Sequence, residues 1–162
     1  MEQFYTLQGE GTWTGTGAYF IRLAGCDVGC HWCDVKESWA PNEAQYLSST
    51  EIVARALASG ADRVVITGGE PTIYDLSILT QELHKAGLYV HMETAGVHDY
   101  TGDIDWVCFS PKKFKAPLDS FYQLSHELKI VVYNEHDFQW AEQHAEKCAP
   151  QTTCREMRST CS

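Results

Sequence analysis

Short apolar runs alternate with amphipathic stretches along most of the chain. Five of the runs are rich in β-branched and aromatic residues and have the length of strands: 17–23, 63–67, 88–92, 106–109 and 128–133. Each run is apolar inside and is followed by polar residues or glycine. This arrangement predicts a parallel sheet whose strands end at one functional edge.

Two stretches between these runs carry apolar side chains at helical spacing. The first begins at Ser48, which can form a capping box with Glu51, and ends before Gly60. The second covers 75–86 and ends at Gly87. A strand, a helix and a further strand of these lengths predict parallel crossover connections, and therefore an α/β fold.

The last part of the chain departs from the pattern. A helix is predicted over 134–147, and such a helix should return the chain to a sixth parallel strand. Residues 148–162 have no β-branched apolar run and no alternation, so we expect an irregular tail without that strand. The sequence therefore predicts one domain over 1–147, with an unprotected edge on the fifth strand.

The composition narrows the possible partners. The 162 residues are 44% hydrophobic, which is enough for one domain with its own core. A formal net charge of −10 argues against a nucleic-acid partner, which would require a basic face. We find no apolar run long enough to span a membrane and no leader, and the number of cysteines, seven, is odd. We therefore expect a cytoplasmic protein with a small-molecule substrate and no membrane contact.

Cys26, Cys30 and Cys33 carry the most specific chemical signal. Their C-x3-C-x2-C spacing suits a soft metal ion or cluster better than a disulfide framework. Three thiolates leave one iron of a [4Fe–4S] cube open to a substrate or cosubstrate. The alternative is a zinc site that borrows His31 or Cys108. Cys108 lies inside a predicted strand, however, where we expect a buried, inert thiol.

Three further features could contact a ligand. Gly68-Gly69-Glu70-Pro71 ends the second apolar run, and its exposed backbone groups can take an amino-acid ligand by its ammonium and carboxylate. Gln8-Gly9-Glu10 precedes the first run, and its glycine allows a close backbone approach. Arg22 interrupts the first run, so its charge is either paired with another side chain or directed at an anion.

Together these motifs resemble those of the 7-carboxy-7-deazaguanine synthase family of radical S-adenosylmethionine (SAM) enzymes. The cysteine spacing and the Gly-Gly-Glu-Pro segment are similar to those of the whole superfamily. The resemblance as a whole rests on these segments: 7–11, 20–23, Gly25-Cys26, Cys33-Asp34, 65–71, Glu93-Thr94 and 110–112. The narrower markers of the synthase family are Leu7-Gln8-Gly9-Glu10-Gly11 and Ser110-Pro111-Lys112. The resemblance covers residues 4–133.

The resemblance implies a lyase of queuosine biosynthesis on a partial, modified (β/α)6 barrel. The enzyme would be a homodimer with a flavodoxin- or ferredoxin-type electron donor. Its reduced [4Fe–4S] cluster would cleave SAM, and the resulting 5′-deoxyadenosyl radical would take a hydrogen from 6-carboxy-5,6,7,8-tetrahydropterin. Ring contraction with loss of ammonia would then give 7-carboxy-7-deazaguanine. The protein would mainly position the reactants and exclude water.

The resemblance also implies roles for individual residues. The implied cluster ligands are Cys26, Cys30 and Cys33; the SAM contacts are Gly68, Gly69, Glu70, Glu93, Ser110 and Lys112; and the pterin contacts are Leu7, Gln8, Gly9, Glu10, Arg22 and Thr67. Arg22 would pair with the substrate carboxylate. Val35 is a departure, because the family has a threonine there whose hydroxyl binds Mg²⁺, and valine supplies no side-chain oxygen.

Two alternatives stand beside an intact synthase. One is a truncated, catalytically impaired member of the family, because the missing strand would expose the substrate to water and weaken its binding. We would then expect aggregation, and SAM cleavage poorly coupled to product. The other alternative is a non-catalytic iron–sulfur or zinc protein.

Overall fold

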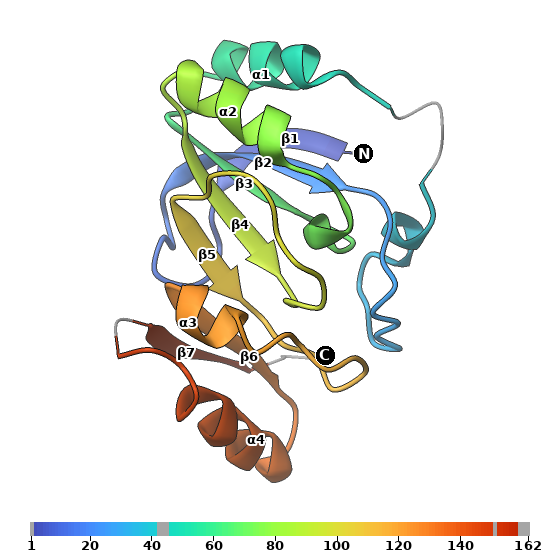
Figure 1. The fold of residues 1–162 in the computed structure, drawn as a ribbon, viewed down its shortest axis with the longest axis vertical. Coiled ribbons are helices and arrows are strands. Elements are labelled where there is room, and N and C mark those ends of the chain that lie inside the picture. The colour runs from blue at the N-terminus through green and yellow to red at the C-terminus, as the bar shows by residue number, and fades with distance from the viewer. Residues whose placement is uncertain (1, 42–45, 151, 159–162) are drawn as a thin grey trace.

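Seven strands form one curved sheet, and their order in the sheet follows their order in the chain (Figure 1). The computed structural model describes residues 2–41, 46–150 and 152–158. The strands are β1 (Glu2–Leu7), β2 (Gly17–Leu23), β3 (Arg63–Gly68), β4 (Tyr89–Thr94), β5 (Trp106–Phe109), β6 (Glu127–Val132) and β7 (Thr153–Arg158). The helices are α1 (Ser49–Ala58), α2 (Ser77–Lys85), α3 (Phe121–Leu124) and α4 (Glu135–Ala145), with 3-10 turns η1 (Lys36–Trp39) and η3 (Pro71–Ile73).

The five strands predicted from the apolar runs are confirmed as β2 to β6, and each parallel pair joins consecutive strands. The predicted helices are confirmed as α1, α2 and α4. The capping box at the start of α1 is also present. The Ser48 hydroxyl accepts a hydrogen bond from the Glu51 N–H, and the Glu51 carboxylate accepts one from the Ser48 N–H. No helix in the described ranges is long and apolar enough to cross a membrane.

β1 was not predicted. It is antiparallel to β2 and pairs Glu2 with Arg22 and Leu7 with Gly17. The sequence missed it because β1 is an edge strand whose side chains are mostly exposed, so it carries no buried apolar run. The pairing brings the Gln8-Gly9-Glu10 segment to the turn that follows β1.

β7 shows that the predicted irregular tail is wrong for Thr153–Arg158. This segment pairs in parallel with the whole of β6, so α4 is a true crossover and β6 has no unprotected edge. An edge strand can join a sheet through backbone hydrogen bonds alone and often carries charged residues. The sequence therefore gave no apolar signal for it. The missing strand was the reason to expect weak substrate binding and poor coupling, and that reason no longer holds. Residues 151 and 159–162 of the predicted tail lie outside the described ranges.

Side chains alternate between the two faces of the sheet. The outer face packs under the helices and forms the main core, in which Ile66, Met92 and Phe109 are fully buried. Polar residues such as Thr67 and Glu93 alternate with these apolar positions and therefore lie on the inner face. The parallel strands thus present a polar inner surface at their carboxyl ends.

Candidate functional site

A cavity of about 660 Å³ lies on the inner face, at the carboxyl ends of the parallel strands. Every residue predicted for the site lines it: Leu7, Gln8, Gly9, Glu10, Arg22, Cys26, Cys30, Cys33, Val35, Thr67, Gly68, Gly69, Glu70, Glu93, Ser110 and Lys112. They come from six different segments of the chain. The sheet therefore brings the predicted cluster, SAM and pterin residues to one place.

The three cysteines stand in the loop that follows β2. Cys30 belongs to a small buried apolar group with Val28, Ala95 and Val97, and Cys26 and Cys33 pack against this group. Burial raises the pKa of both the Cys26 and the Cys30 thiols. A bound metal favours the thiolate form of a cysteine ligand and would therefore offset the effect of burial. Three cysteines that lie together beside an open cavity suit an iron–sulfur cluster.

The geometry does not favour the zinc alternative. The His31 ring is exposed and packs edge-on against Phe114, with the ring centroids 4.9 Å apart. Cys108 is buried, and burial raises its pKa far above the ordinary value, which confirms the expected inert thiol. Within the described ranges, no three His, Cys, Asp or Glu side chains converge on a single metal ion. A four-iron cube spreads its ligands more widely, because each thiolate binds a different iron.

The Gly68-Gly69 pair is tied directly to the cysteine loop. The Gly69 N–H donates to the Leu23 carbonyl at 2.9 Å, and the next N–H donates to the Gly25 carbonyl at 2.8 Å. Gly68 has φ +133°, and a Cβ there would lie 2.1 Å from the Leu23 oxygen. A Cβ on Gly69 would lie 2.0 Å from the Gly25 oxygen. Only glycine allows the two loops to approach this closely.

The Glu70 side chain, which is predicted to contact SAM, also makes hydrogen bonds within the protein. Its carboxylate is buried and accepts hydrogen bonds from the Thr72 N–H at 3.1 Å, the Thr72 hydroxyl at 2.7 Å and the Ala95 N–H at 2.8 Å. The Thr94 hydroxyl donates to it as well. The side chain therefore joins the Gly-Gly loop to the end of β4 and holds the loop in place.

A buried lysine that the sequence analysis missed links two of the predicted residues. Lys129 Nζ on β6 lies 2.9 Å from the Glu10 carboxylate and 2.7 Å from the Glu93 carboxylate. The Gln8 amide donates to the other oxygen of Glu93 at 2.9 Å and accepts from the Glu10 N–H at 3.1 Å. We call Lys129, Glu10 and Glu93 the charged trio. A lysine inside an apolar run was the available signal, as it was for Arg22.

The charges of the trio stabilise one another. Burial alone would raise the pKa of Glu93, but the Lys129 charge, His91 and the hydrogen bonds from Lys129 and Gln8 together outweigh burial and lower that pKa to about 2. Burial would likewise lower the pKa of Lys129, and the two carboxylates instead raise it above its ordinary value. At neutral pH Glu93 and Lys129 are therefore both ionised.

Ser110 and Lys112 follow β5 and face the same cavity. The Lys112 ammonium donates to the Ser110 carbonyl at 2.5 Å and to its hydroxyl at 2.6 Å. Burial lowers the pKa of Lys112 to about 8. This lysine thus retains a cationic form near neutral pH beside the cysteine loop.

Arg22 lies at the cavity wall with a single exposed carboxylate beside it. Its Nε is 3.3 Å from Glu2, and its guanidinium lies 5.9 Å from the centroid of the Phe4 ring. Glu2 is mostly exposed, so this pair is weak and leaves the arginine suited to an anionic ligand.

Val35 also lines the cavity, just before η1. Its carbonyl accepts hydrogen bonds from the Ser38 N–H at 3.0 Å and the Ser38 hydroxyl at 2.7 Å. The position therefore offers a metal ion no side-chain oxygen, and a backbone oxygen that already has two donors. These groups do not fit Mg²⁺, which requires an octahedron of oxygen ligands.

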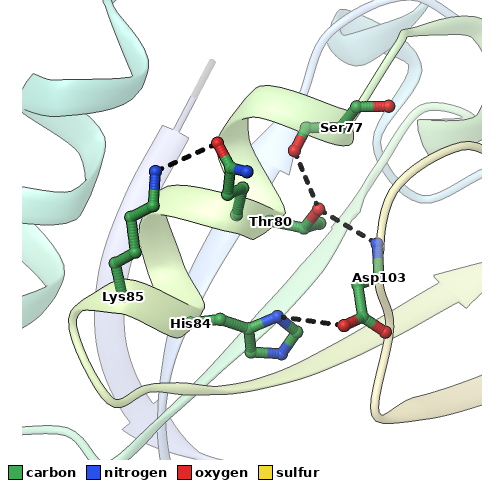
Figure 2. Close-up of a pocket in the computed structure, with 6 residues that line it drawn as sticks. Ser77, Thr80, His84, Lys85 and Asp103 are labelled. Atoms are coloured by element: carbon green, nitrogen blue, oxygen red, sulfur yellow. Dashed lines mark hydrogen bonds and ion pairs between the residues drawn. The ribbon is translucent and has the colours of Figure 1, made fainter.

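A second depression, of about 520 Å³, lies along α2 (Figure 2). It is lined by Ser77, Thr80, Gln81, His84, Lys85 and Asp103. His84 lies 2.8 Å from Asp105 and 3.7 Å from Asp103. No residue predicted for the site lines this depression, and the inner-face cavity remains the candidate site.

Comparisons with known proteins agree with this geometry. The family model of the Radical SAM superfamily matches residues 20–148. The chain is 53% identical over 148 residues to a 7-carboxy-7-deazaguanine synthase of Flavobacterium psychrophilum, a match that covers 91% of this chain and 70% of the relative. It is 46% identical over 151 residues to a protein of the same name from Synechocystis sp., covering 93% of this chain and 73% of the relative.

A solved structure is similar over nearly the whole chain. The crystal structure of QueE from Escherichia coli superposes with a TM-score of 0.87 at 33% sequence identity. The match covers 98% of this chain and 83% of that chain.

Proposed function

The chain belongs to the radical SAM superfamily and, within it, to the 7-carboxy-7-deazaguanine synthases, and from this premise we propose its reaction and the roles of its residues. The reaction is the conversion of 6-carboxy-5,6,7,8-tetrahydropterin to 7-carboxy-7-deazaguanine with loss of ammonia, a lyase step in queuosine biosynthesis. The observation that carries the proposal is the single cavity lined by all three sets of predicted residues.

Cys26, Cys30 and Cys33 are the proposed ligands of a [4Fe–4S] cluster. When bound, the cluster and SAM supply the radical chemistry that starts the reaction. The apolar group under the cysteines supports this role, because it shields one side of the sulfur atoms from water.

The backbone of Gly68 and Gly69 is the proposed contact for the amino-acid part of SAM. Its approach to the cysteine loop supports this role, because a ligand held there would also reach the open side of a cluster. Ser110, Lys112 and Glu93 are further proposed SAM contacts, because all three line the same cavity. Glu70 acts through the loop that it holds.

The pterin is assigned to Leu7, Gln8, Gly9, Glu10, Arg22 and Thr67. The turn after β1 supports this assignment, because the hydrogen bond from Gln8 to Glu93 fixes it over the inner face. The Arg22 guanidinium matches the substrate carboxylate in charge and shape. These residues orient the substrate and exclude water from it.

Further parts of the proposal concern partners and surroundings. We propose a flavodoxin- or ferredoxin-type electron donor, a homodimer and a cytoplasmic location, all on the resemblance to the synthase family. A reducing compartment would keep the cysteine thiols available to iron.

The test of the proposed function is anaerobic reconstitution with iron and sulfide, followed by incubation with SAM, the tetrahydropterin and a reductant. We expect 7-carboxy-7-deazaguanine to form in at least the amount of any 5′-deoxyadenosine, because the conversion loses only ammonia and the hydrogen that the radical takes must be returned. A non-catalytic iron–sulfur or zinc protein would yield neither product. An impaired enzyme would yield 5′-deoxyadenosine without a matching amount of the deazaguanine.

Val35→Thr is expected to raise the response of the enzyme to Mg²⁺. The new hydroxyl would supply the side-chain oxygen that Val35 lacks, and we expect the apparent affinity for Mg²⁺ to rise roughly tenfold. Turnover measured across a Mg²⁺ titration checks this. Val35→Ala, which adds no oxygen, is the matched control and should not gain the response. A wild-type enzyme that responds to Mg²⁺ as strongly as the threonine variant would contradict the prediction.

A further inference from the structure

The charged trio is the most densely charged feature of the cavity. The Lys129 side chain is only 12% exposed, and it lies between two carboxylates that also line the cavity. Glu10 comes from the turn after β1 and Glu93 from the end of β4, so the lysine on β6 connects three distant parts of the chain. Burying an ammonium group is costly, so this lysine is best explained by a function that requires its charge at this position.

The hydrogen-bonding capacity of the trio is not used up within the protein. A lysine ammonium has three N–H donors, and two of them go to Glu10 and Glu93. No described residue accepts the third. Similarly, no described residue donates to Oε1 of Glu10, whose side chain is 41% exposed. The trio therefore keeps a donor and an acceptor available beside the cavity.

The neighbouring side chains form no ion pairs with the trio in the described part of the chain. Burial lowers the pKa of His91 to about 4, so this ring is neutral at pH 7, and the Cys108 thiol is neutral too. The titratable groups that interact with Glu93 or Lys129 from neighbouring elements are His91 on β4, Cys108 on β5 and Lys112 after β5, and Arg22 on β2 lines the same cavity. Arg63 on β3 and Glu127 on β6 interact with His91 and Cys108, one step further away. None of these is within salt-bridge distance of the trio in the described structure.

We propose that Lys129 is a positioning residue for the substrate: it pairs with Glu10 and Glu93 and holds both carboxylates where they accept hydrogen bonds from N–H groups of the reduced pterin. This inference rests on the proposed function. A tetrahydropterin carries N–H groups on both rings, and ionised carboxylates are strong acceptors for such groups. Arg22 would hold the substrate carboxylate at the same time.

The charge of Lys129 is the reason that both carboxylates can remain acceptors. Without the ammonium, the largely buried Glu93 carboxylate would lie close to the Glu10 carboxylate, and burial and the like charge would together raise its pKa until it takes up a proton. The protonated oxygen of a carboxyl group is a hydrogen-bond donor and cannot accept a hydrogen bond from a pterin N–H as a carboxylate oxygen does. The ammonium between them prevents this.

The experiment compares Lys129→Met with Lys129→Arg and with Lys85→Met, a surface lysine on α2, as the control. In Lys129→Met we expect the KM for the tetrahydropterin to rise roughly 10- to 100-fold. The cluster absorption at about 400 nm depends on the cysteine loop and should stay at the wild-type level. Lys129→Arg should recover most of the loss, and Lys85→Met should behave as wild type.

The pH profile separates positioning from packing. In the wild-type enzyme Glu93 stays ionised over the working range, because its pKa is about 2. In Lys129→Met the pKa of a trio carboxylate should rise above its ordinary value, so activity should fall as the pH drops through roughly 5–8 and recover at higher pH. A loss of packing alone would lower activity equally at every pH.

Two outcomes overturn the proposal. One is an unchanged KM and pH profile in Lys129→Met. The other concerns a second variant, Glu10→Gln, which is used if Lys129→Met fails to fold. Glu10 lies in an exposed turn, and this variant should also weaken substrate binding. Unchanged binding in Glu10→Gln would contradict the proposal. Binding is also measured directly, by titration with fluorescent 6-carboxypterin. A wild-type protein that binds this probe through the trio but forms no deazaguanine would overturn the proposed reaction and leave the positioning role intact.

Discussion

Replacing Cys26, Cys30 or Cys33 singly with alanine is expected to remove the cluster and all turnover. Each variant would leave a four-iron cube with two protein ligands in place of three, and such a cluster is not held stably. The charge-transfer absorption at about 400 nm that a [4Fe–4S] centre shows should therefore fall sharply after anaerobic reconstitution of each variant. Deazaguanine formation should fall to the level of a sample without iron.

Cys108→Ala is the matched control for these variants. Cys108 is buried in β5, and its thiol remains protonated because burial raises its pKa far above the ordinary value. This variant should keep the full absorption and the full iron content. Wild-type absorption in any one of the three loop variants would show that the corresponding cysteine is not a ligand.

Gly69→Ala is expected to have the second largest effect. Its Cβ would stand 2.0 Å from the Gly25 carbonyl oxygen, so the Gly-Gly loop and the cysteine loop would have to move apart. We expect a loss of about 1–3 kcal/mol in the free energy of unfolding from the overlap, together with loss of SAM binding. Urea denaturation and equilibrium dialysis with SAM measure the two effects. Gly68→Ala adds backbone strain at φ +133° to a similar overlap and should be worse.

Gly60→Ala is the control that measures the cost of a positive φ without any atomic overlap. Gly60 also has a positive φ, +74°, but a Cβ there meets no atom within 4 Å. It should lower stability by about 1–2 kcal/mol and leave SAM binding unchanged. If Gly69→Ala bound SAM as well as Gly60→Ala does, the close approach of the two loops would not be needed for the site.

The strands that could be predicted from the sequence are the buried ones. The runs that became β2 to β6 are apolar because their side chains fill the core under the helices, as Ile66 and Met92 do. β1 and β7 lie at the edges of the sheet, where backbone pairing is sufficient and the sequence carries little apolar signal. Both were missed for this one physical reason.

The membership of the site was more predictable than its connections. Polar residues at the strand ends identified the lining of the cavity, because parallel strands bring their carboxyl ends together. Which side chains pair across the cavity depends on contacts such as that between Lys129 and Glu10, which are 119 positions apart. A pattern read along the chain cannot show such a pair. For the same reason the sequence did not show that the Glu70 carboxylate joins two loops of the protein itself.

The order of the strands has a consequence for how the chain reaches its native state during synthesis. Every strand pairs with the one made just before it, so the sheet can grow by addition at one edge as the polypeptide leaves the ribosome. The cysteine loop meets the Gly-Gly loop as soon as β3 has docked on β2, whereas Lys129 arrives four strands after β2. We therefore expect the iron-binding half to take shape first, and the substrate-holding half to be completed only when β6 is added.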